Sequence, residues 1–394
     1  MKKFLLATAA TALFTTGAFA AEVKIGIILG FTGPIESMTP AMADGAELAM
    51  AEVTKSGKLL GGLTVVPVRG DDLCIDSAAA IAVMERLVTS DKVAAVVGGD
   101  CSGVTGAMLQ NVARPNGIVM ISPSATSPAL SSAEDDGLFF RTAPSDARQG
   151  QVVSDILNSR GFKSIAITYT NNDYGKGLAD AIQASFEKDG GKVTINAAHE
   201  DGKADYSAEV GALASAGGEV LVVAGYLDQG GKGIIQASVD SGAFSVFELP
   251  DGMVGDPLLA SLGNAINGSF GQLPGTDSPG ATSFVEMAKV AGFDGTGAFS
   301  PESYDAAALI MLAMAAANST DSQVFKSKVM DVANAPGEKI YPGELGKALD
   351  IINAGGDIDY VGASAVELIG PGESAGNYRE VDVIDGKFVT KQYR

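Results

Sequence analysis

Short apolar runs of strand length alternate with segments of helical periodicity along the first half of the chain. These patterns predict strands at 23–29, 63–68, 93–97 and 118–121, separated by helices at 41–53, 77–88 and 104–112. Thr39 and Pro40 precede the first of these helices, which predicts Thr39 as its N-cap. Regular alternation of strands and helices is typical of a parallel sheet covered by helices on both faces.

The same alternation restarts after a polar stretch at 141–149, which we interpret as a break between two units. It predicts strands at 164–168, 193–197 and 220–224, with helices at 177–186, 206–213 and 233–239. A second break rich in Gly, Pro, Ser and Thr covers 272–279, followed by predicted helices at 299–317 and 322–332. The chain ends in a predicted hairpin, 378–384 with 387–391, around Asp385-Gly386. The last stretch is too short to form a domain, so we expect two α/β lobes between which the chain crosses more than once.

The first twenty residues have the features of a secretory signal peptide. Lys2 and Lys3 precede an apolar stretch at 4–19, and Ala18-Phe19-Ala20 fits a cleavage site. We therefore expect an exported mature chain that begins at Ala21, with 374 residues. That length exceeds the roughly 250–300 residues at which a single core stops growing, which again favours two domains. No later apolar run reaches the roughly 18 residues of a membrane-spanning helix.

The net charge limits the classes of partner, and the cysteine and histidine content limits the covalent links and metal sites that we expect. The formal net charge is −20, and it becomes −22 when the two lysines of the signal peptide are removed. A surface this acidic repels phosphate backbones, so we expect no nucleic-acid partner. Cys74 and Cys101 are the two cysteines, and in an oxidising compartment they predict a disulfide. His199 is the single histidine, so neither a metal site nor a cofactor is expected.

Polar residues gather where predicted strands end, which is where parallel sheets bind their ligands. In the first half these are hydroxyl residues and small neighbours, including the start of a helix: Ser102, Ser124, Ala125 and Thr126. They suit an anion such as a carboxylate. In the second half they are Tyr174, Tyr226 and Asp251, and an acid opposite hydroxyls can receive an ammonium group. Taken singly, the serines also fit helix caps or turns, Asp251-Gly252 fits a turn, and the tyrosines fit the boundary of a core.

Catalytic patterns are weak. There is no G-x-S-x-G nucleophile elbow and no phosphate-binding P-loop motif. We expect His199 to lie at the surface, and we expect Asp71-Asp72 and Glu134-Asp135-Asp136 to form solvated acidic surface rather than a catalytic pair. An enzyme is therefore not the favoured interpretation.

Taken together, these segments resemble the periplasmic branched-chain amino-acid binding proteins of bacterial ABC transporters, the leucine/isoleucine/valine type. The motifs that carry the resemblance are VKIG at 23–26, TGP at 32–34, Asp71-Asp72 with Cys74, Val97-Gly98 leading to Cys101-Ser102, MISPSAT at 120–126, DYGKG at 173–177, DIDY at 357–360 and DGK at 385–387. The resemblance implies the type I periplasmic binding protein fold: two Rossmann-like lobes with parallel sheets, joined by a multi-strand hinge. It places lobe 1 at 21–143 plus 273–374, and lobe 2 at 144–272 plus 375–394.

The resemblance also assigns roles to residues already singled out. Ser102, Ser124 and Thr126 match positions that hold the ligand's α-carboxylate, and Asp251 matches the acid that faces its ammonium group. Tyr174 and Tyr226 match aromatic positions that close over the ligand, Cys74 and Cys101 match the disulfide pair, and Phe299 or Tyr304 matches an apolar wall. The implied mechanism is hinge closure in the periplasm, with a membrane permease as partner and a monomeric binding protein.

This sequence departs from the family's usual residues at two positions. Met38 stands where an aromatic residue is usual, and Asp251 is one methylene shorter than the family's glutamate. Because methionine is flexible, the side-chain pocket is expected to have a different shape. An amide, urea or aromatic acid is therefore kept as an alternative to an amino-acid ligand, and a sensor for a membrane receptor as an alternative to a transport role.

Overall fold

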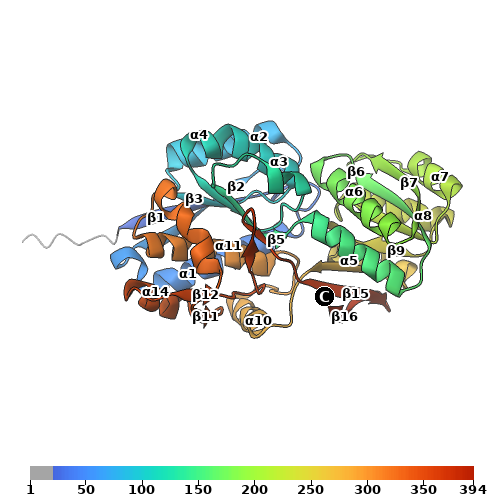
Figure 1. Ribbon diagram of the computed structural model, residues 1–394. Helices are drawn as coiled ribbons and strands as arrows, with labels where there is room; N and C mark the ends of the chain where they lie inside the picture. The colour runs from blue at the N-terminus through green and yellow to red at the C-terminus, as the bar shows by residue number, and fades with distance from the viewer. Residues whose placement is uncertain (1–20) are drawn as a thin grey trace, which may run out of the picture.

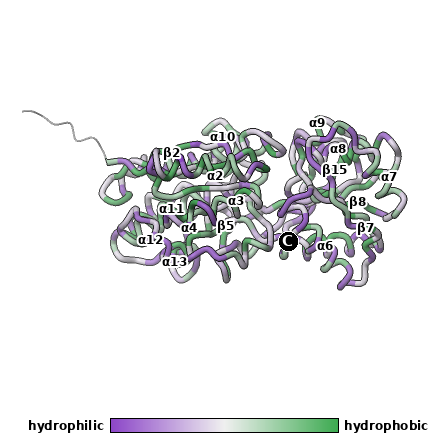
Figure 2. The backbone as a smooth tube through the Cα atoms, turned by 90° about the horizontal axis from the view of Figure 1, so that it is seen from above, coloured by the Kyte–Doolittle hydropathy of each residue, from purple (hydrophilic) through white to green (hydrophobic). Residues whose placement is uncertain are grey.

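The computed structural model describes residues 21–394, so the predicted signal peptide at 1–20 lies outside the described residues. Two lobes lie side by side, each built on its own sheet, and the C-terminus lies between them (Figure 1). Seen after a turn of 90°, the lobes are again separate on either side of a narrow waist (Figure 2).

The sheet of lobe 1 has seven strands in the order β13-β14-β5-β4-β3-β1-β2. Their bounds are β1 Glu22–Leu29, β2 Thr64–Asp71, β3 Ala95–Gly98, β4 Val119–Ser122, β5 Phe139–Pro144, β13 Leu368–Ile369 and β14 Glu373–Ser374. Strands β1 to β5 pair in parallel. Strands β3 and β4 are buried along their whole length, because helices cover both faces of a parallel sheet.

The helices of lobe 1 come from segments far apart in the sequence. They are α1 Thr39–Ser56, α2 Ser77–Arg86, α3 Ser102–Met108, α4 Arg114–Asn116, α10 Pro279–Ala291, α11 Ser300–Ala317, α12 Ser322–Phe325, α13 Val329–Ala333 and α14 Leu345–Asn353, with a small sheet of β11 Glu338–Ile340 and β12 Ile358–Tyr360. Helix α11 packs against α1 and is buried on nearly all sides. Its sequence is accordingly apolar all round rather than along one stripe.

The sheet of lobe 2 has the order β16-β15-β10-β9-β8-β6-β7. Its strands are β6 Ser164–Thr170, β7 Lys192–His199, β8 Val220–Ala224, β9 Phe247–Leu249, β10 Phe270–Pro274, β15 Tyr378–Ile384 and β16 Lys387–Tyr393, flanked by α5 Asp146–Ser159, α6 Asp173–Lys188, α7 Ser207–Ala216, α8 Gly230–Ser241 and α9 Asp256–Leu262. The terminal hairpin β15–β16 adds antiparallel strands to an otherwise parallel sheet.

The chain passes between the lobes at three places. It leaves lobe 1 between β5 and α5, returns between β10 and α10, and leaves again between β14 and β15. The predicted fold class, with two mostly parallel sheets and several crossings, is confirmed. The lobe boundaries drawn from the sequence stay a prediction.

Three local predictions are wrong. The stretch 141–149 is not a loop, because it holds the end of β5 and the start of α5. Its most polar residue, Arg141, is buried and pairs with Glu373 at 2.5 Å, so its charge is satisfied inside the protein. Thr39 does not cap α1: Met38 occupies the N-cap position, and the Thr39 hydroxyl donates to the carbonyl of Gly30 at 3.2 Å. The single helix predicted at 322–332 is divided into α12 and α13.

In residues 21–394 no helix combines the length and apolar character that crossing a membrane requires.

Candidate ligand-binding site

The ends of strands from both sheets meet at one enclosed cavity. Ser102 follows β3, Ser124 follows β4, Tyr174 follows β6, Tyr226 follows β8 and Asp251 follows β9. These five residues and Met38 line a narrow cavity with a volume of about 20 Å³. It is also lined by Ile35, Asp100, Cys101 and Gly252, to which the sequence assigned no ligand contact, and by Phe299, one of the two expected options for an apolar wall. The second option, Tyr304, donates its hydroxyl to Glu52 instead.

Ala125 and Thr126 are buried behind the lining of this cavity. The Ala125 N–H donates to the hydroxyl of Ser122 at 2.9 Å, and its carbonyl accepts from Arg141 at 3.0 Å. The hydroxyl oxygen of Thr126 is buried and has no hydrogen-bond partner among the described residues. The Thr126 hydroxyl also lowers the pKa of the neighbouring Asp146 carboxyl, so either Asp146 or a ligand that reaches behind the lining could satisfy this hydroxyl.

The wall from lobe 1 consists of hydroxyl groups on loops that main-chain hydrogen bonds hold in place. The Ser102 hydroxyl accepts from the N–H of Ser127 at 3.1 Å, and the Ser124 hydroxyl donates to the carbonyl of Asp100 at 3.1 Å. Ser102 accepts in its bond and keeps its own proton for a donation, whereas the proton of Ser124 is used in the bond to Asp100 and would have to turn toward a ligand. The wall therefore offers polar groups at fixed positions to an anionic group.

The wall from lobe 2 consists of two aromatic rings and an acid. Tyr174 and Tyr226 stack with ring centroids 5.2 Å apart. The Tyr174 hydroxyl donates to Asp251 Oδ1 at 2.8 Å, and Gln149 Nε2 donates to Oδ2 at 2.6 Å. Gly252 N–H adds a third bond at 2.7 Å. These donors fix the orientation of the carboxyl group of Asp251, a residue that is 1% exposed.

The electrostatics of this wall are unfavourable in the absence of a cation. Burial raises the pKa of Asp251, and the hydrogen bonds from Tyr174 and Gln149 offset only part of that shift. Burial also raises the pKa of Asp146 well above its usual value, and the negative charge of Asp251 raises it further. Both oxygens of Asp146 lack a hydrogen-bond partner among the described residues. Asp146 does not line the cavity, so of these two carboxyl groups only that of Asp251 can face a cationic group placed there.

Asp146 was missed because it lies in the stretch interpreted as a polar break. The sequence feature that could have identified it is its place after a strand, since Asp146 follows β5 just as Ser102 follows β3. Gln149, one turn further along α5, was missed for the same reason.

Two expectations about polar residues are wrong. His199 ends β7 and is 1% exposed, and burial lowers its pKa to about 4. Its Nδ1 lies 2.9 Å from the hydroxyl oxygen of Thr168, and His199 does not line the cavity. Asp72 is fully buried. Desolvation is the largest cause that raises its pKa well above the usual value, and the negative charge of Asp100 is the second cause.

The predicted disulfide is confirmed. Cys74 and Cys101 are bonded, and Cys101 lines the cavity. The neighbouring Asp100 carboxylate accepts from Gly30 N–H at 2.6 Å, and burial raises its pKa to about 6. These links fasten the loop after β3 to the loops after β1 and β2.

Across residues 21–394 no three or more His, Cys, Asp or Glu side chains are grouped in a way that could hold a metal ion. The polar groups of the cavity are instead hydroxyls, carboxyls and main-chain amides, which are the partners of a small zwitterion.

Comparison with known proteins identifies one family and relatives with the same kind of name. A sequence model of the family described as "Periplasmic binding protein" matches residues 22–338. A Brucella melitensis protein named Leu/Ile/Val-binding protein homolog 1 is 33% identical over 341 residues, covering 85% of this chain and 87% of its own. The leucine-, isoleucine-, valine-, threonine-, and alanine-binding protein of Pseudomonas aeruginosa is 29% identical, covering 87% of this chain and 90% of its own.

Solved structures share the fold at lower identity. A leucine binding protein from Thermotoga maritima superposes with a TM-score of 0.79 at 21% identity, covering 94% of this chain and 98% of its own. A solute binding protein from Rhodopseudomonas palustris in complex with 4-hydroxybenzoate gives a TM-score of 0.75 at 19% identity, covering 94% of this chain and 96% of its own. Proteins with different ligands thus share this architecture, and the ligand must be argued from the cavity.

Proposed function

The chain belongs to the periplasmic binding protein family, and on that premise we propose that it captures a branched-chain or similar hydrophobic α-amino acid between its lobes. We propose further that it delivers the amino acid to the membrane permease of an ABC importer. The observation that supports an amino acid most strongly is the buried carboxyl group of Asp251, oriented by three hydrogen bonds and facing a wall of hydroxyls.

The ligand's ammonium group is proposed to bind beside Asp251. A cation there stabilises the ionised carboxylate that burial otherwise disfavours, and it reduces the repulsion between Asp251 and Asp146. The unpartnered hydroxyl of Thr126 is proposed to accept one of the ammonium protons.

The ligand's α-carboxylate is proposed to accept from the hydroxyl of Ser102, and from that of Ser124 once its proton turns away from the Asp100 carbonyl. The apolar side chains of Ile35, Met38 and Phe299 line the same cavity and would contact the ligand's aliphatic side chain. Tyr174 and Tyr226 would cover the ligand from the side of lobe 2. The space left between these residues is about 20 Å³, enough for a water-sized group, so the lobes would have to separate to admit the ligand, and a site this small suits a small molecule rather than a peptide.

Binding requires both lobes, because the two sets of polar partners belong to different sheets. Ligand contacts made only when the lobes approach would shift the population toward the closed form, which a permease can distinguish from the open form. We propose that the protein performs this cycle in the periplasm as a monomer after removal of residues 1–20, with no chemistry on the ligand.

An aromatic acid is the second candidate, since a neighbour of similar fold is described in complex with 4-hydroxybenzoate. Such a ligand has a carboxylate and no cation. It would leave Asp251 buried without a counter-charge, so the cavity favours the amino acid. A sensor role would use the same cavity, and genes for a permease and an ATPase beside this one would argue against it.

Isothermal titration calorimetry of the mature protein tests the proposal with leucine, isoleucine, valine, phenylalanine and benzoate. We expect binding of at least one aliphatic amino acid, and weaker binding in a Ser102→Ala variant. Asp240→Asn is the matched control, because Asp240 lies near the end of α8 and does not line the cavity. Binding of benzoate and of none of the amino acids would overturn the proposal.

A further inference from the structure

A second, larger cavity lies next to the proposed ligand site. Its volume is about 310 Å³, and both lobes line it: the start of α1, the loop before α11, the start of α9, and strands β10, β15 and β16. Met38 is the one residue that lines both this cavity and the ligand cavity, and the adjacent residues Ala298 and Phe299 line one each. The two cavities are therefore separated by a thin wall in which Met38 is the shared side chain.

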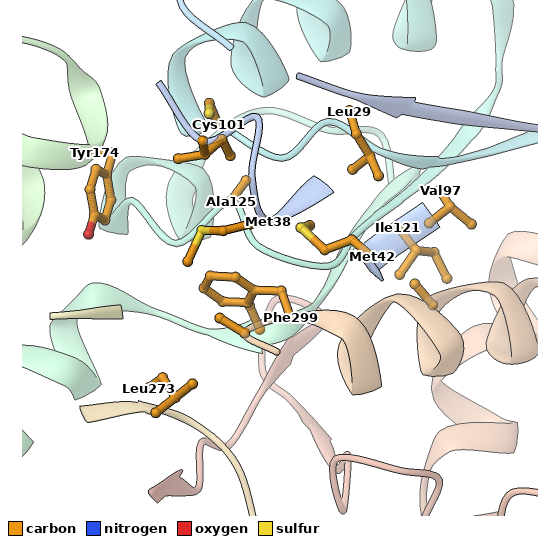
Figure 3. Packing of buried hydrophobic residues seen from close by; sticks show 14 of the residues in the cluster. Leu29, Met38, Met42, Val97, Cys101, Ile121, Ala125, Tyr174, Leu273 and Phe299 are labelled. Atoms are coloured by element: carbon orange, nitrogen blue, oxygen red, sulfur yellow. The ribbon is translucent and has the colours of Figure 1, made fainter. Parts of the chain in front are cut away.

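Met38 is suited to move. It lies at the N-cap position of α1, where no side-chain capping bond holds it. Figure 3 shows Met38 above the ring of Phe299, with Cys101 and Ala125 on one side and Leu273 on the other. Cys101 lines the ligand cavity and Leu273 lines the second cavity. An unbranched thioether side chain has three rotatable bonds and adapts to irregular space, so a change of rotamer could join the two cavities.

The second cavity contains a cation with an unused donor. Arg379 lies on β15, and its Nη2 donates to the carbonyl of Thr296 at 3.3 Å. Its Nε is buried and has no hydrogen-bond partner among residues 21–394. The same cavity is lined by two acids, Asp256 and Asp294. Both acids are exposed to solvent. A neutral group that accepts from the guanidinium and donates to a carboxylate fits this set of neighbours. A neutral amide or ureido group has this combination of donors and acceptors.

We propose that Met38 is a movable partition, and that the site also takes α-amino acids whose long side chain ends in a neutral amide or ureido group. The α-ammonium and α-carboxylate would bind as described above, so the inference rests on the proposed function. The side chain would pass Met38, and its terminal carbonyl would accept from Arg379.

Calorimetric titration with leucine, norleucine and citrulline tests this inference. We expect the wild-type protein to bind leucine and citrulline. An Arg379→Gln variant should weaken citrulline by about tenfold or more, the loss of a hydrogen bond to a charged group, and leave leucine and norleucine within about twofold. Lys387→Gln, an exposed change on β16, is the matched control and should alter none of the three affinities.

A Met38→Phe variant tests the partition itself. A rigid ring with two rotatable bonds should block the passage, so the ratio of citrulline to leucine affinity should fall by about tenfold. Leucine binding without citrulline binding in the wild-type protein would overturn the inference and leave the proposed function standing. The reverse result would overturn the branched-chain assignment and support the inference. An equal loss of both ligands in Arg379→Gln would also contradict it, because Arg379 would then act through the fold.

Discussion

Replacing Asp251 by asparagine should weaken ligand binding and stabilise the empty protein at the same time. The substitution keeps the size of the side chain and removes its charge. The asparagine side chain could still accept from the Tyr174 hydroxyl, which lies 2.8 Å from Oδ1 of the native aspartate. The opposing donor Gln149 would face either the amide oxygen or the amide nitrogen, depending on which way the asparagine turns.

The loss in binding follows from one hydrogen bond between charged groups. Such a bond is worth about 1.5–3 kcal/mol, so the dissociation constant for leucine should rise by about 10- to 150-fold. The lower end applies if Thr126 keeps its proposed contact with the ammonium group. Calorimetry at pH 7 measures the change directly, with Asp240→Asn as the control.

The gain in stability follows from the raised pKa of Asp251. Burial makes the charged form less favourable in the folded protein than in the unfolded chain, so the carboxyl group lowers the free energy of unfolding at pH 7. This contribution is absent below the unfolded pKa and develops as the pH rises through the folded pKa. Asparagine resembles the neutral form at every pH. Thermal unfolding of the ligand-free variant should therefore occur at a higher temperature than that of the wild-type protein at pH 7.

Lower stability together with unchanged leucine affinity in this variant would refute the reasoning. It would mean that the three donors to Asp251 stabilise a structural carboxylate and that no cation binds there.

Three further predictions concern other parts of the fold. Asp228 Oδ2 accepts from Ser37 N–H at 3.0 Å across the two lobes, and Asp228 does not line the ligand cavity; Asp228→Ala should therefore weaken leucine binding about 2- to 10-fold through loss of the closed form, and unchanged calorimetry would argue against this role. Burial raises the pKa of Glu248 to about 8. Between about pH 4.5 and 8 this group should therefore lower the free energy of unfolding of the wild-type protein by up to about 1.4 kcal/mol per pH unit. Unfolding curves of Glu248→Gln over that range should show a smaller decrease, and an equal decrease in both proteins would contradict this role. Replacing Cys74 and Cys101 by serine opens a disulfide that spans 27 positions and should lower the free energy of unfolding by about 3–4 kcal/mol in denaturant titrations, whereas equal midpoints would contradict the predicted stabilisation.

The fold could be predicted because its signal is repeated many times along the chain. Apolar runs such as β3 and β8 are buried on both faces, and their alternation with helices specifies a parallel sheet twice over. The residues at the ends of these strands could be placed by the same logic, since the carboxyl ends of parallel strands meet at one edge. The disulfide followed from the presence of two cysteines in a chain that is predicted to be exported.

The rest depends on contacts between distant segments. Arg141 and Asp146 are polar residues in the interior, and a single sequence does not reveal that Glu373, 232 positions away, neutralises the arginine. His199 was misplaced because a polar residue at the end of a strand can face either solvent or the interior, and here its ring packs edge-on against Tyr206. The position of Met38 between two cavities depends on α1, α9 and β10 meeting in space, which no local pattern encodes.

We propose that one cavity recognises both charged groups of an amino acid. It is tested most directly by comparing leucine with two analogues in calorimetry: 4-methylpentanoate, which lacks the ammonium group, and 3-methylbutylamine, which lacks the carboxylate. We predict that each analogue binds at least about 100-fold more weakly than leucine, because each leaves buried polar groups of one wall unpaired. Binding of 4-methylpentanoate as tight as that of leucine would contradict the claim, since it would show that Asp251 does not face an ammonium group.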